Sequence, residues 1–371
     1  MKLGVITTSY PRFPGDPAGN FVAGHVGALR ALGHDVEVIA AGAAGAPRAP
    51  RPEREPIRIG GARLFYRGGA PDALERAPIR AGAAAAVFTA RLTAAVTARA
   101  RRWDAIIAHW LVPCALAALA SSPRLIAIAH GGDVFTLRRL HLLRPMLEAL
   151  RRRDARVVFV AEHLRVIARD AAPALSPWLD RAIVSPMGVP LERFAALVRA
   201  PSDPPVVLVV ARLVPIKGVD VAIAAMPHVR RDVRLVIAGA GPEHERLART
   251  RGAHTLLGEV TTDQRDDLLR TAAVVVVPSR LTPSGRTEGT PSIALEALAA
   301  GVPVIASSVG GLREVPGVCL VPPDDPIALG REIDHIIAAP PSAESLRAAV
   351  AGLDWREVAP HLLREGLGAP A

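Results

Sequence analysis

Glu288–Ile305 reads EGTPSIALEALAAGVPVI, a stretch that predicts a loop, a helix, a glycine stop and a buried strand in that order. The helix is expected to begin near Pro291. Glu288 then lies just before its N-terminus, and Glu296 lies inside its second turn. The free N–H groups and the positive dipole end of such a helix favour an anion. We therefore expect an anion such as a phosphate to bind at Gly289, Thr290, Pro291 and Ser292, where the proline offers no N–H.

The same alternation of short apolar strands and longer helical segments extends outward over the whole chain of 371 residues. Strands are predicted in the second half at Val206–Val210, Leu235–Ala238, Thr255–Leu257, Val274–Val277 and Val302–Ala306. In the first half they are predicted at Leu3–Thr7, Val36–Ala40, Ala105–Ala108, Leu125–Ala129 and Val157–Val160. Unbroken apolar strands separated by helices indicate parallel sheets covered on both faces.

These patterns predict an α/β protein of two Rossmann-like domains that face each other across a deep cleft, where ligands of open α/β sheets bind. A proline-rich stretch at 200–205 places the boundary near 187–204. The predicted domains are 1–190 and 205–345. Residues 342–368 are predicted to form two helices, and within the C-terminal segment 346–371 the last helix, starting near Trp355, is expected to cross back and pack on the first domain.

Two cations lie at the turn after the strand Val206–Val210. Arg212 and Lys217 are five residues apart at the edge of the sheet, where a guanidinium and an ammonium can both reach a diphosphate. Lys2 and Lys217 are the only lysines among the 45 cationic side chains, which argues mildly against an ordinary surface lysine.

Further turns at the predicted sheet edges are candidates to contact a ligand. Gly241 lies in a glycine turn that lets a ligand approach the backbone, and Glu259 and Val260 follow a short strand where backbone groups can hold a base. In the first half, His109 and His130 each end a strand, and His109 is expected to line the same pocket.

Arg-x4-Lys, Gly-x-Gly-Pro, Gly-Glu-Val and Glu-x7-Glu, in this order and spacing, resemble glycosyltransferase family 4. The resemblance implies the retaining, two-domain GT-B type. Arg212 and Lys217 would hold the donor's phosphates, Glu296 would bind ribose hydroxyls, and Glu288 would face the transferred sugar. The Glu-Gly-x-Pro form, preceded by the loop 280–287, looks like a subgroup that builds exopolysaccharide or lipid-linked glycans.

The resemblance also assigns roles in the first domain. The long Gly/Pro loop after the first strand resembles the family's glycine loop, with Gly19 expected near the diphosphate and Asn20 near the acceptor. His130 would lie near the donor sugar and the reacting centre, and Asp133 near the acceptor. The loop is not a GxGxxG fingerprint, so a nicotinamide cofactor is poorly supported.

The resemblance thus implies an enzyme that moves a hexose-type sugar from a nucleotide diphosphate sugar, with UDP favoured over GDP, to a hydroxyl acceptor. The acceptor is expected to be a glycan, a lipid-linked molecule or a small molecule. No Asp-x-Asp triplet is present for a divalent ion, so no metal and no cofactor beyond the nucleotide sugar are expected. Two alternatives stay open: a nonhydrolysing sugar-nucleotide epimerase of the same architecture, and a noncatalytic nucleotide-sugar-binding partner subunit.

The net charge of +10 alone would also fit nucleic acid, but only 4% of residues are aromatic and no reader motif is present, so no nucleic-acid partner is expected. The apolar runs are too short for a spanning helix and the N-terminus lacks signal-peptide features, which predicts a cytoplasmic protein. Residues 136–153 mix apolar side chains with six arginines. This basic amphipathic stretch is expected to rest on anionic lipid at the inner face of the membrane, to bind a phosphorylated acceptor, or to be a solvated helix face. The pattern leaves the oligomeric state open.

Overall fold

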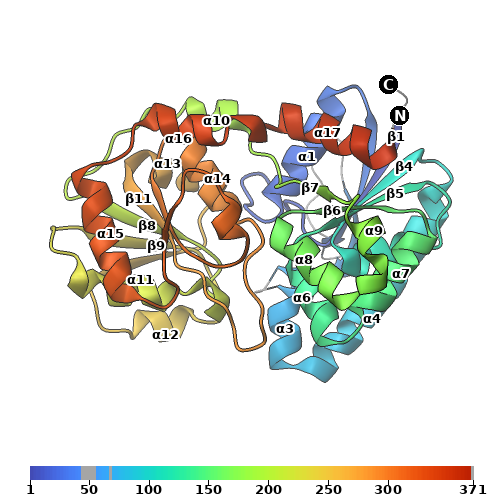
Figure 1. Ribbon diagram of the computed structural model, residues 1–371, viewed down its shortest axis with the longest axis horizontal. Helices are drawn as coiled ribbons and strands as arrows, with labels where there is room; N and C mark the ends of the chain where they lie inside the picture. The colour runs from blue at the N-terminus through green and yellow to red at the C-terminus, as the bar shows by residue number, and fades with distance from the viewer. Residues whose placement is uncertain (43–55, 67–68, 369–371) are drawn as a thin grey trace. The chain divides into compact units, whose positions relative to one another are not determined.

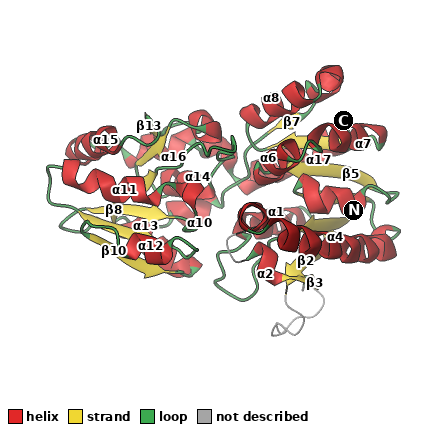
Figure 2. Cartoon of the chain, turned by 90° about the horizontal axis from the view of Figure 1, so that it is seen from below, coloured by secondary structure: helices red, strands yellow, loops and turns green. Residues whose placement is uncertain are grey.

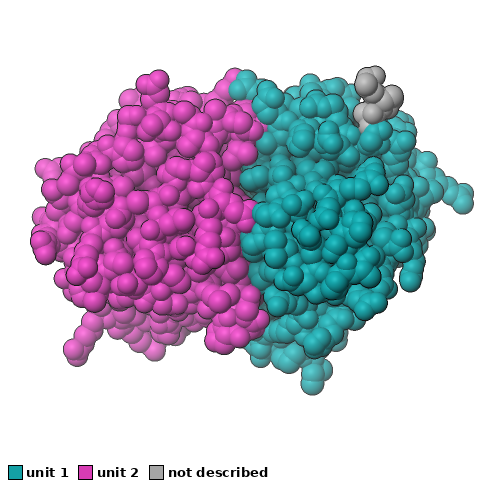
Figure 3. Space-filling model, in the orientation of Figure 1, with its two compact units in different colours: residues 1–188, 355–371 teal, residues 189–354 magenta. Residues whose placement is uncertain are grey.

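The computed structural model describes residues 1–42, 56–66 and 69–368, and divides the chain into two compact units (Figures 1 and 3). The first unit contains Met1–Gly188 and Trp355–Ala371, and the second contains Val189–Asp354. The last helix, α17 (Trp355–Leu367), therefore belongs to the first unit, where it packs on α1, β5 and β6. The helix before it, α16 (Ala343–Ala349), belongs to the second unit, so of the predicted segment 346–371 only the part from Trp355, where the last helix is predicted to begin, packs on the first unit.

Within the described residues, the first unit contains a seven-stranded parallel sheet in the order β3-β2-β1-β4-β5-β6-β7. Its strands are β1 (Lys2–Thr7), β2 (Asp35–Gly42), β3 (Ile57–Gly61), β4 (Ala105–His109), β5 (Arg124–Ala129), β6 (Arg156–Phe159) and β7 (Ile183–Val184). Besides α17, its helices are α1 (Asn20–Ala31), α2 (Ala62–Phe65), α3 (Ala70–Arg76), α4 (Pro78–Ala100), α5 (Leu116–Ala118), α6 (Gly132–Arg139), α7 (Leu143–Arg152), α8 (Glu162–Ala171) and α9 (Ser176–Leu179).

The second unit, as far as it is described, has a six-stranded parallel sheet in the order β10-β9-β8-β11-β12-β13. The strands are β8 (Val206–Val210), β9 (Arg234–Ala238), β10 (His254–Gly258), β11 (Ala272–Val277), β12 (Val304–Ser307) and β13 (Cys319–Val321). The helices are α10 (Leu191–Ala195), α11 (Val219–Ala225), α12 (His244–Ala248), α13 (Thr262–Thr271), α14 (Ser292–Ala299), α15 (Pro326–Ala338) and α16.

Both sheets are covered by helices on their two faces, as Figure 2 shows. Strand β8 illustrates why. Successive strand residues point to opposite faces, and Val206 and Leu208 enter the core on one side while Val207 and Val209 enter the core on the other. The prediction of two parallel-sheet α/β halves is confirmed; the cleft between them stays a prediction.

Helix α4 differs from the sequence prediction that no segment is long and apolar enough to span a membrane. Of the helices in the described ranges, α4 alone meets that test of length and composition. Only 22% of the apolar window of α4 is buried, although Phe88, Leu92 and Val96 enter the core of the first unit at helical spacing.

Candidate functional site

The carboxyl ends of β8 and β11 meet where the strand order of the second sheet reverses. From β8 the chain proceeds through β9 to β10 on one side, and then returns to β11 on the other. Such a switch point separates the loops of neighbouring strands and is where open α/β sheets bind ligands. The loop 211–218 after β8 and the loop 278–291 after β11 both begin there.

Lys217 and Glu288 meet at this switch point. The ammonium Nζ of Lys217 lies 2.7 Å from Oε1 of Glu288, and the two side chains are only 17% and 12% exposed. Gly218 makes the close approach of the two loops possible, because its φ is +58° and a Cβ there would lie 2.0 Å from the carbonyl oxygen of Pro278. The structure thus places together two of the residues that we predicted from separate motifs.

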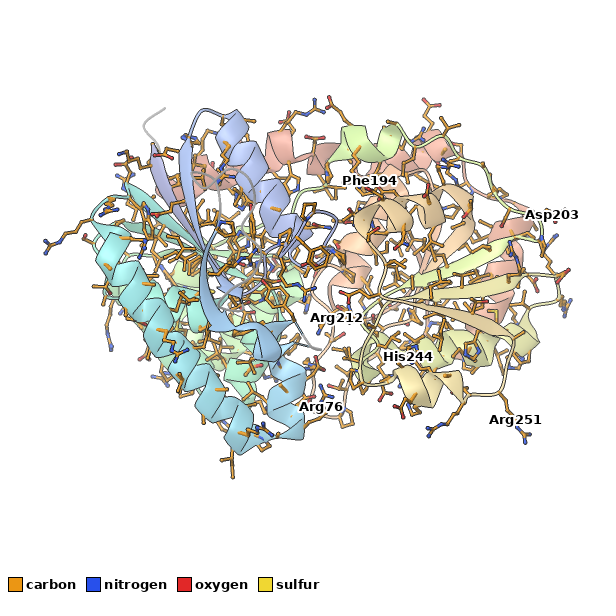
Figure 4. All side chains as sticks on the ribbon, turned by 180° about the vertical axis from the view of Figure 1, so that it is seen from behind. Arg76, Phe194, Asp203, Arg212, His244 and Arg251 are labelled. Atoms are coloured by element: carbon orange, nitrogen blue, oxygen red, sulfur yellow. The ribbon has the colours of Figure 1, made fainter. Side chains whose placement is uncertain are left out.

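The surroundings of Glu288 keep its carboxylate ionised. Burial alone would raise its pKa, but Lys217, the Ser279 hydroxyl that donates to Oε1 at 3.0 Å, and the charge of Arg212 together hold the pKa below its ordinary value. Arg212 itself is exposed just after β8 and is labelled in Figure 4. A nearly buried carboxylate is therefore kept negative beside two cations.

The helix that follows this loop begins as the sequence predicts. α14 starts at Ser292, with Pro291 as the residue before it. Its first turn contains no acidic residue, so no carboxylate of its own occupies the positive end of the helix. Gly289 and Pro291 are buried, Thr290 is half-buried and Ser292 is exposed.

Glu296 is buried and paired with an arginine. It is 8% exposed, and Nη1 of Arg265 lies 3.1 Å from its Oε2. Arg265 also pairs with Asp266 at 2.9 Å, so these groups form a small buried ionic cluster. Burial raises the pKa of Glu296, with the charge of Asp266 adding to it and the charge of Arg265 opposing it. Its binding of ribose hydroxyls stays a prediction.

The loops after β9 and β10 contain the remaining predicted residues of the second unit. Gly241 lies so close to the β8 loop that a Cβ would approach the carbonyl oxygen of Leu213 to 2.3 Å. Glu259 is exposed and Val260 is half-buried directly after β10. These residues are on the same carboxyl edge as Lys217, because all strands of the sheet are parallel.

In the first unit, Gly19 and Asn20 lie at the start of α1, after the loop that follows β1. Gly19 has a φ of +72°, and a Cβ there would come within 2.4 Å of the carbonyl oxygen of Ser9. Only glycine fits this return of the loop. Their predicted contacts with a diphosphate and an acceptor stay predictions.

The structure corrects two predicted acceptor contacts. His109 is fully buried, so it presents no surface to a ligand. The carboxylate of Asp133 is also buried, and it accepts hydrogen bonds from the backbone N–H groups of Leu111 at 2.6 Å and His130 at 3.1 Å. Asp133 thus fixes the backbone after β4 and β5, while burial raises its pKa to about 6 against these hydrogen bonds.

His130 follows the end of β5 and is half-buried. Trp110 packs on it at a centroid distance of 4.7 Å and Phe21 at 5.2 Å. Trp110 has a φ of +77°, an unfavourable conformation for a bulky residue, which here accompanies the packing of the indole on His130. Burial is the first cause that lowers the pKa of His130, to about 3, so the ring is neutral near pH 7.

Three residues with close contacts to the predicted site were missed. Ser279 lies just after β11, at the start of the loop that leads to Glu288, and has no predicted role. Arg265 lies in a helix of polar residues that looks solvent-exposed, and His25 lies among Val22, Val26 and Leu29 on the buried face of α1. The position of His25 among the apolar residues of one helix face could have indicated that it is buried.

The fold and site define a two-unit α/β protein with charged groups gathered at the ligand-binding edge of its second sheet. Residues 18–193 match the family model described as Glycosyltransferase Family 4, and residues 204–339 match the one described as Glycosyl transferases group 1. The chain belongs to this family of glycosyltransferases.

Curated relatives agree with this membership. The chain is 33% identical to the GDP-mannose-dependent alpha-(1-6)-phosphatidylinositol monomannoside mannosyltransferase of Mycolicibacterium smegmatis over 65% of this chain and 67% of that protein. It is 28% identical to the glycogen synthase of Mycobacterium tuberculosis over 97% of this chain and 92% of that protein. Against three other relatives, at 34 to 38% identity, the chain spans 36 to 55% of their length.

Solved structures share the fold. Sucrose-phosphate synthase from Thermosynechococcus elongatus matches all of this chain and all of its own at 22% identity and a TM-score of 0.71. HepE from Anabaena, in complex with UDP-glucose, matches 98% of this chain and 99% of its own chain at 18% identity and a TM-score of 0.69. The fold is therefore GT-B.

Proposed function

We propose that this protein is a metal-independent retaining glycosyltransferase that moves a hexose-type sugar from a nucleotide diphosphate sugar to a hydroxyl acceptor. The ion pair of Lys217 and Glu288 at the switch point carries the proposal. It combines a cation for a diphosphate with an ionised carboxylate. The family membership supports the reaction class.

The reaction demands stabilisation of a negative charge. The bond between the anomeric carbon and the phosphate oxygen breaks, charge grows on the leaving diphosphate, and the acceptor oxygen bonds to the same carbon. Retention follows from attack on the face that the diphosphate leaves, with the diphosphate taking the acceptor's proton. Arg212, Lys217 and the N-terminus of α14 would stabilise the diphosphate, and one such donor is worth about 3 kcal/mol in similar sites.

The donor is proposed to be a UDP-sugar in preference to a GDP-sugar. The HepE structures contain UDP and UDP-glucose, which supports uridine, whereas the related mannosyltransferase is named as GDP-mannose-dependent. Val260 and Glu259 after β10 are the proposed contacts for the base, and Glu296 the proposed contact for the ribose.

A thermal-shift screen of UDP- and GDP-sugars tests the donor. A nucleotide sugar at 100 times its dissociation constant should stabilise the protein by about 2.7 kcal/mol, and only the matching base should do so. Release of the nucleotide should then require an acceptor. Conversion of the sugar nucleotide without any acceptor would indicate the epimerase instead, and binding without turnover on any acceptor would indicate the noncatalytic subunit.

The acceptor is proposed to be a glycan or a lipid-linked molecule, reached from the cytoplasmic face of an anionic membrane. The stretch 136–153 forms the end of α6, a turn and α7, and its Leu143, Met146, Leu147 and Leu150 are buried. It therefore offers no apolar helix face to lipid. The turn does expose Leu140 and Leu142, each 50% exposed, between the exposed Arg138 and Arg144.

Vesicle binding tests this membrane contact. Replacing Arg138, Arg144 and Arg152 with glutamine should weaken binding to anionic vesicles by roughly tenfold or more, because each arginine near an anionic surface adds attraction. Arg153 is left intact, since it donates to the carbonyl oxygens of Ser121 and Pro123. Cosedimentation with vesicles measures the effect.

The control replaces the exposed Arg231, Arg249 and Arg251 of the second unit with glutamine, which removes the same charge from another surface. Equal binding by the two variants would refute the membrane contact of this stretch.

A further inference from the structure

Three histidines from three elements form a continuous hydrogen-bonded chain inside the first unit. Nδ1 of His25 on α1 lies 3.2 Å from Nε2 of His109 at the end of β4. Nδ1 of His109 lies 3.0 Å from Nε2 of His130 after β5. We call these three side chains the histidine chain. His25 is 1% exposed and His109 is fully buried, so water does not reach these two rings.

Packing holds the far end of the histidine chain. The ring of His25 stacks on the indole of Trp355 at 5.1 Å with an interplanar angle of 9°, and His109 stacks on His130 at 5.2 Å and 19°. Trp355 begins α17, the helix that returns to the first unit from the end of the chain. The stacking therefore restricts rotation of the rings away from the orientations that form the two hydrogen bonds.

The chemistry of imidazole permits only two hydrogen arrangements in this chain. A neutral imidazole has one N–H donor and one acceptor nitrogen. All three rings are neutral, because burial lowers the pKa of His25 to about 4, that of His130 to about 3, and that of His109 well below its ordinary value. Each hydrogen bond needs one hydrogen, so both bonds must point the same way along the chain.

The two arrangements differ at the ends. If the bonds point toward His130, its Nε2 accepts and its Nδ1 carries the hydrogen. If they point toward His25, Nδ1 of His130 is bare and Nε2 of His25 carries a hydrogen. In the described part of the chain, the buried Nε2 of His25 has no hydrogen-bond partner. A buried N–H without an acceptor is rarely tolerated in proteins, which favours the first arrangement.

We propose that His25 and His109 are positioning residues that hold His130 in the tautomer whose Nδ1 carries the hydrogen. His130 then offers a fixed neutral donor at the end of β5. This inference rests on the proposed function in one respect only, namely the ligand to which His130 donates its hydrogen bond. That ligand atom is a hydroxyl or phosphate oxygen of the nucleotide sugar. Because Nε2 of His25 has no hydrogen-bond partner, the histidine chain has no exit for a proton at this end. The chain therefore orients the hydrogen on His130 and does not conduct protons.

Nitrogen NMR of protein labelled at histidine with ¹⁵N tests the proposal without any substrate. The wild-type spectrum should show His130 protonated at Nδ1 and bare at Nε2, with a scalar coupling between Nδ1 of His109 and Nε2 of His130 across the hydrogen bond. A bare Nδ1 on His130, or an equal mixture of tautomers, would overturn it.

A matched pair of variants at His109 separates positioning from packing. His109→Asn keeps an amide N–H near the place of Nδ1, so it should preserve the His130 tautomer. His109→Leu has similar size without a donor, so the preference should be lost. If His109→Leu folds and retains the wild-type tautomer, the proposal is wrong, and if it does not fold, the wild-type spectrum still decides.

Transfer kinetics then connect the tautomer to the proposed function. In His109→Leu, kcat should fall about tenfold or more while KM stays nearly constant, because His109 touches no ligand and the lost donor acts on the reacting sugar. His109→Asn should recover most of the rate. A protein that shows the predicted tautomer but transfers no sugar would contradict the proposed function and leave the positioning of His130 intact.

Discussion

Lys217→Ala should lower kcat/KM for transfer by about a hundredfold or more, the effect of removing one preorganised charge partner from a leaving group. It should also weaken nucleotide binding, because the ammonium is proposed to bind the diphosphate in the ground state as well. The loss has a second cause. Without the cation at 2.7 Å, the carboxylate of Glu288 is buried beside fewer positive charges, and its pKa rises.

Steady-state kinetics and a titration of UDP against the thermal midpoint measure the two effects of Lys217→Ala. Arg251→Ala is the matched control, since it removes an exposed cation from the same unit, and Figure 4 shows Arg251 away from Arg212. Wild-type activity in Lys217→Ala would refute its assignment, as would an equal loss in Arg251→Ala.

The sequence predicted the location of Lys217 and Glu288 but could not predict that they pair. Each residue follows a buried strand, and strands and turns are local patterns of the chain. The contact depends on β11 returning beside β8, a property of strand order. The short strand β3 was missed because Arg58 interrupts its apolar pattern, and β7 and β13 because they contain only two and three residues.

Burial by distant elements explains the wrong prediction at His109. A residue that ends a parallel strand is normally at the open edge of the sheet, where ligands bind. His109 is instead enclosed by His25 from α1, and His25 in turn by Trp355 from α17. The sequence predicts that the last helix packs on the first domain, but it does not indicate that Trp355 of this helix covers His25.

Arg265 was missed for a related reason. Its helix, α13, reads TDQRDDLLRT, and so polar a segment normally faces solvent. Arg265 is nevertheless 8% exposed, because Glu296 and Asp266 neutralise it and Phe194 packs against its guanidinium at 5.3 Å. A pair of this kind can be recognised only once the structure shows that α13, with Arg265, lies beside α14, with Glu296.

Glu288→Gln should reduce transfer as strongly as Lys217→Ala but affect nucleotide binding in the opposite direction. Glutamine has the size of glutamate and can still accept a hydrogen bond from Ser279, so the loop after β11 should keep its course. Its neutral amide cannot stabilise positive charge on the reacting sugar, and kcat should fall about a hundredfold or more. Lys217 meanwhile loses its anionic partner, and its ammonium becomes more available to the diphosphate.

The dissociation constant for UDP should therefore stay the same or decrease in Glu288→Gln, whereas it should increase in Lys217→Ala. Glu245→Gln provides the control, because Glu245 is an exposed carboxylate of the same unit that is 84% exposed and pairs with Arg249. Weaker UDP binding in Glu288→Gln would mean that the carboxylate organises the phosphate site and does not act on the sugar. Unchanged kcat would remove Glu288 from the reaction altogether. Loss of kcat with retained or tighter UDP binding is the combination that the ion pair predicts, since its two members serve opposite charges in the same transition state.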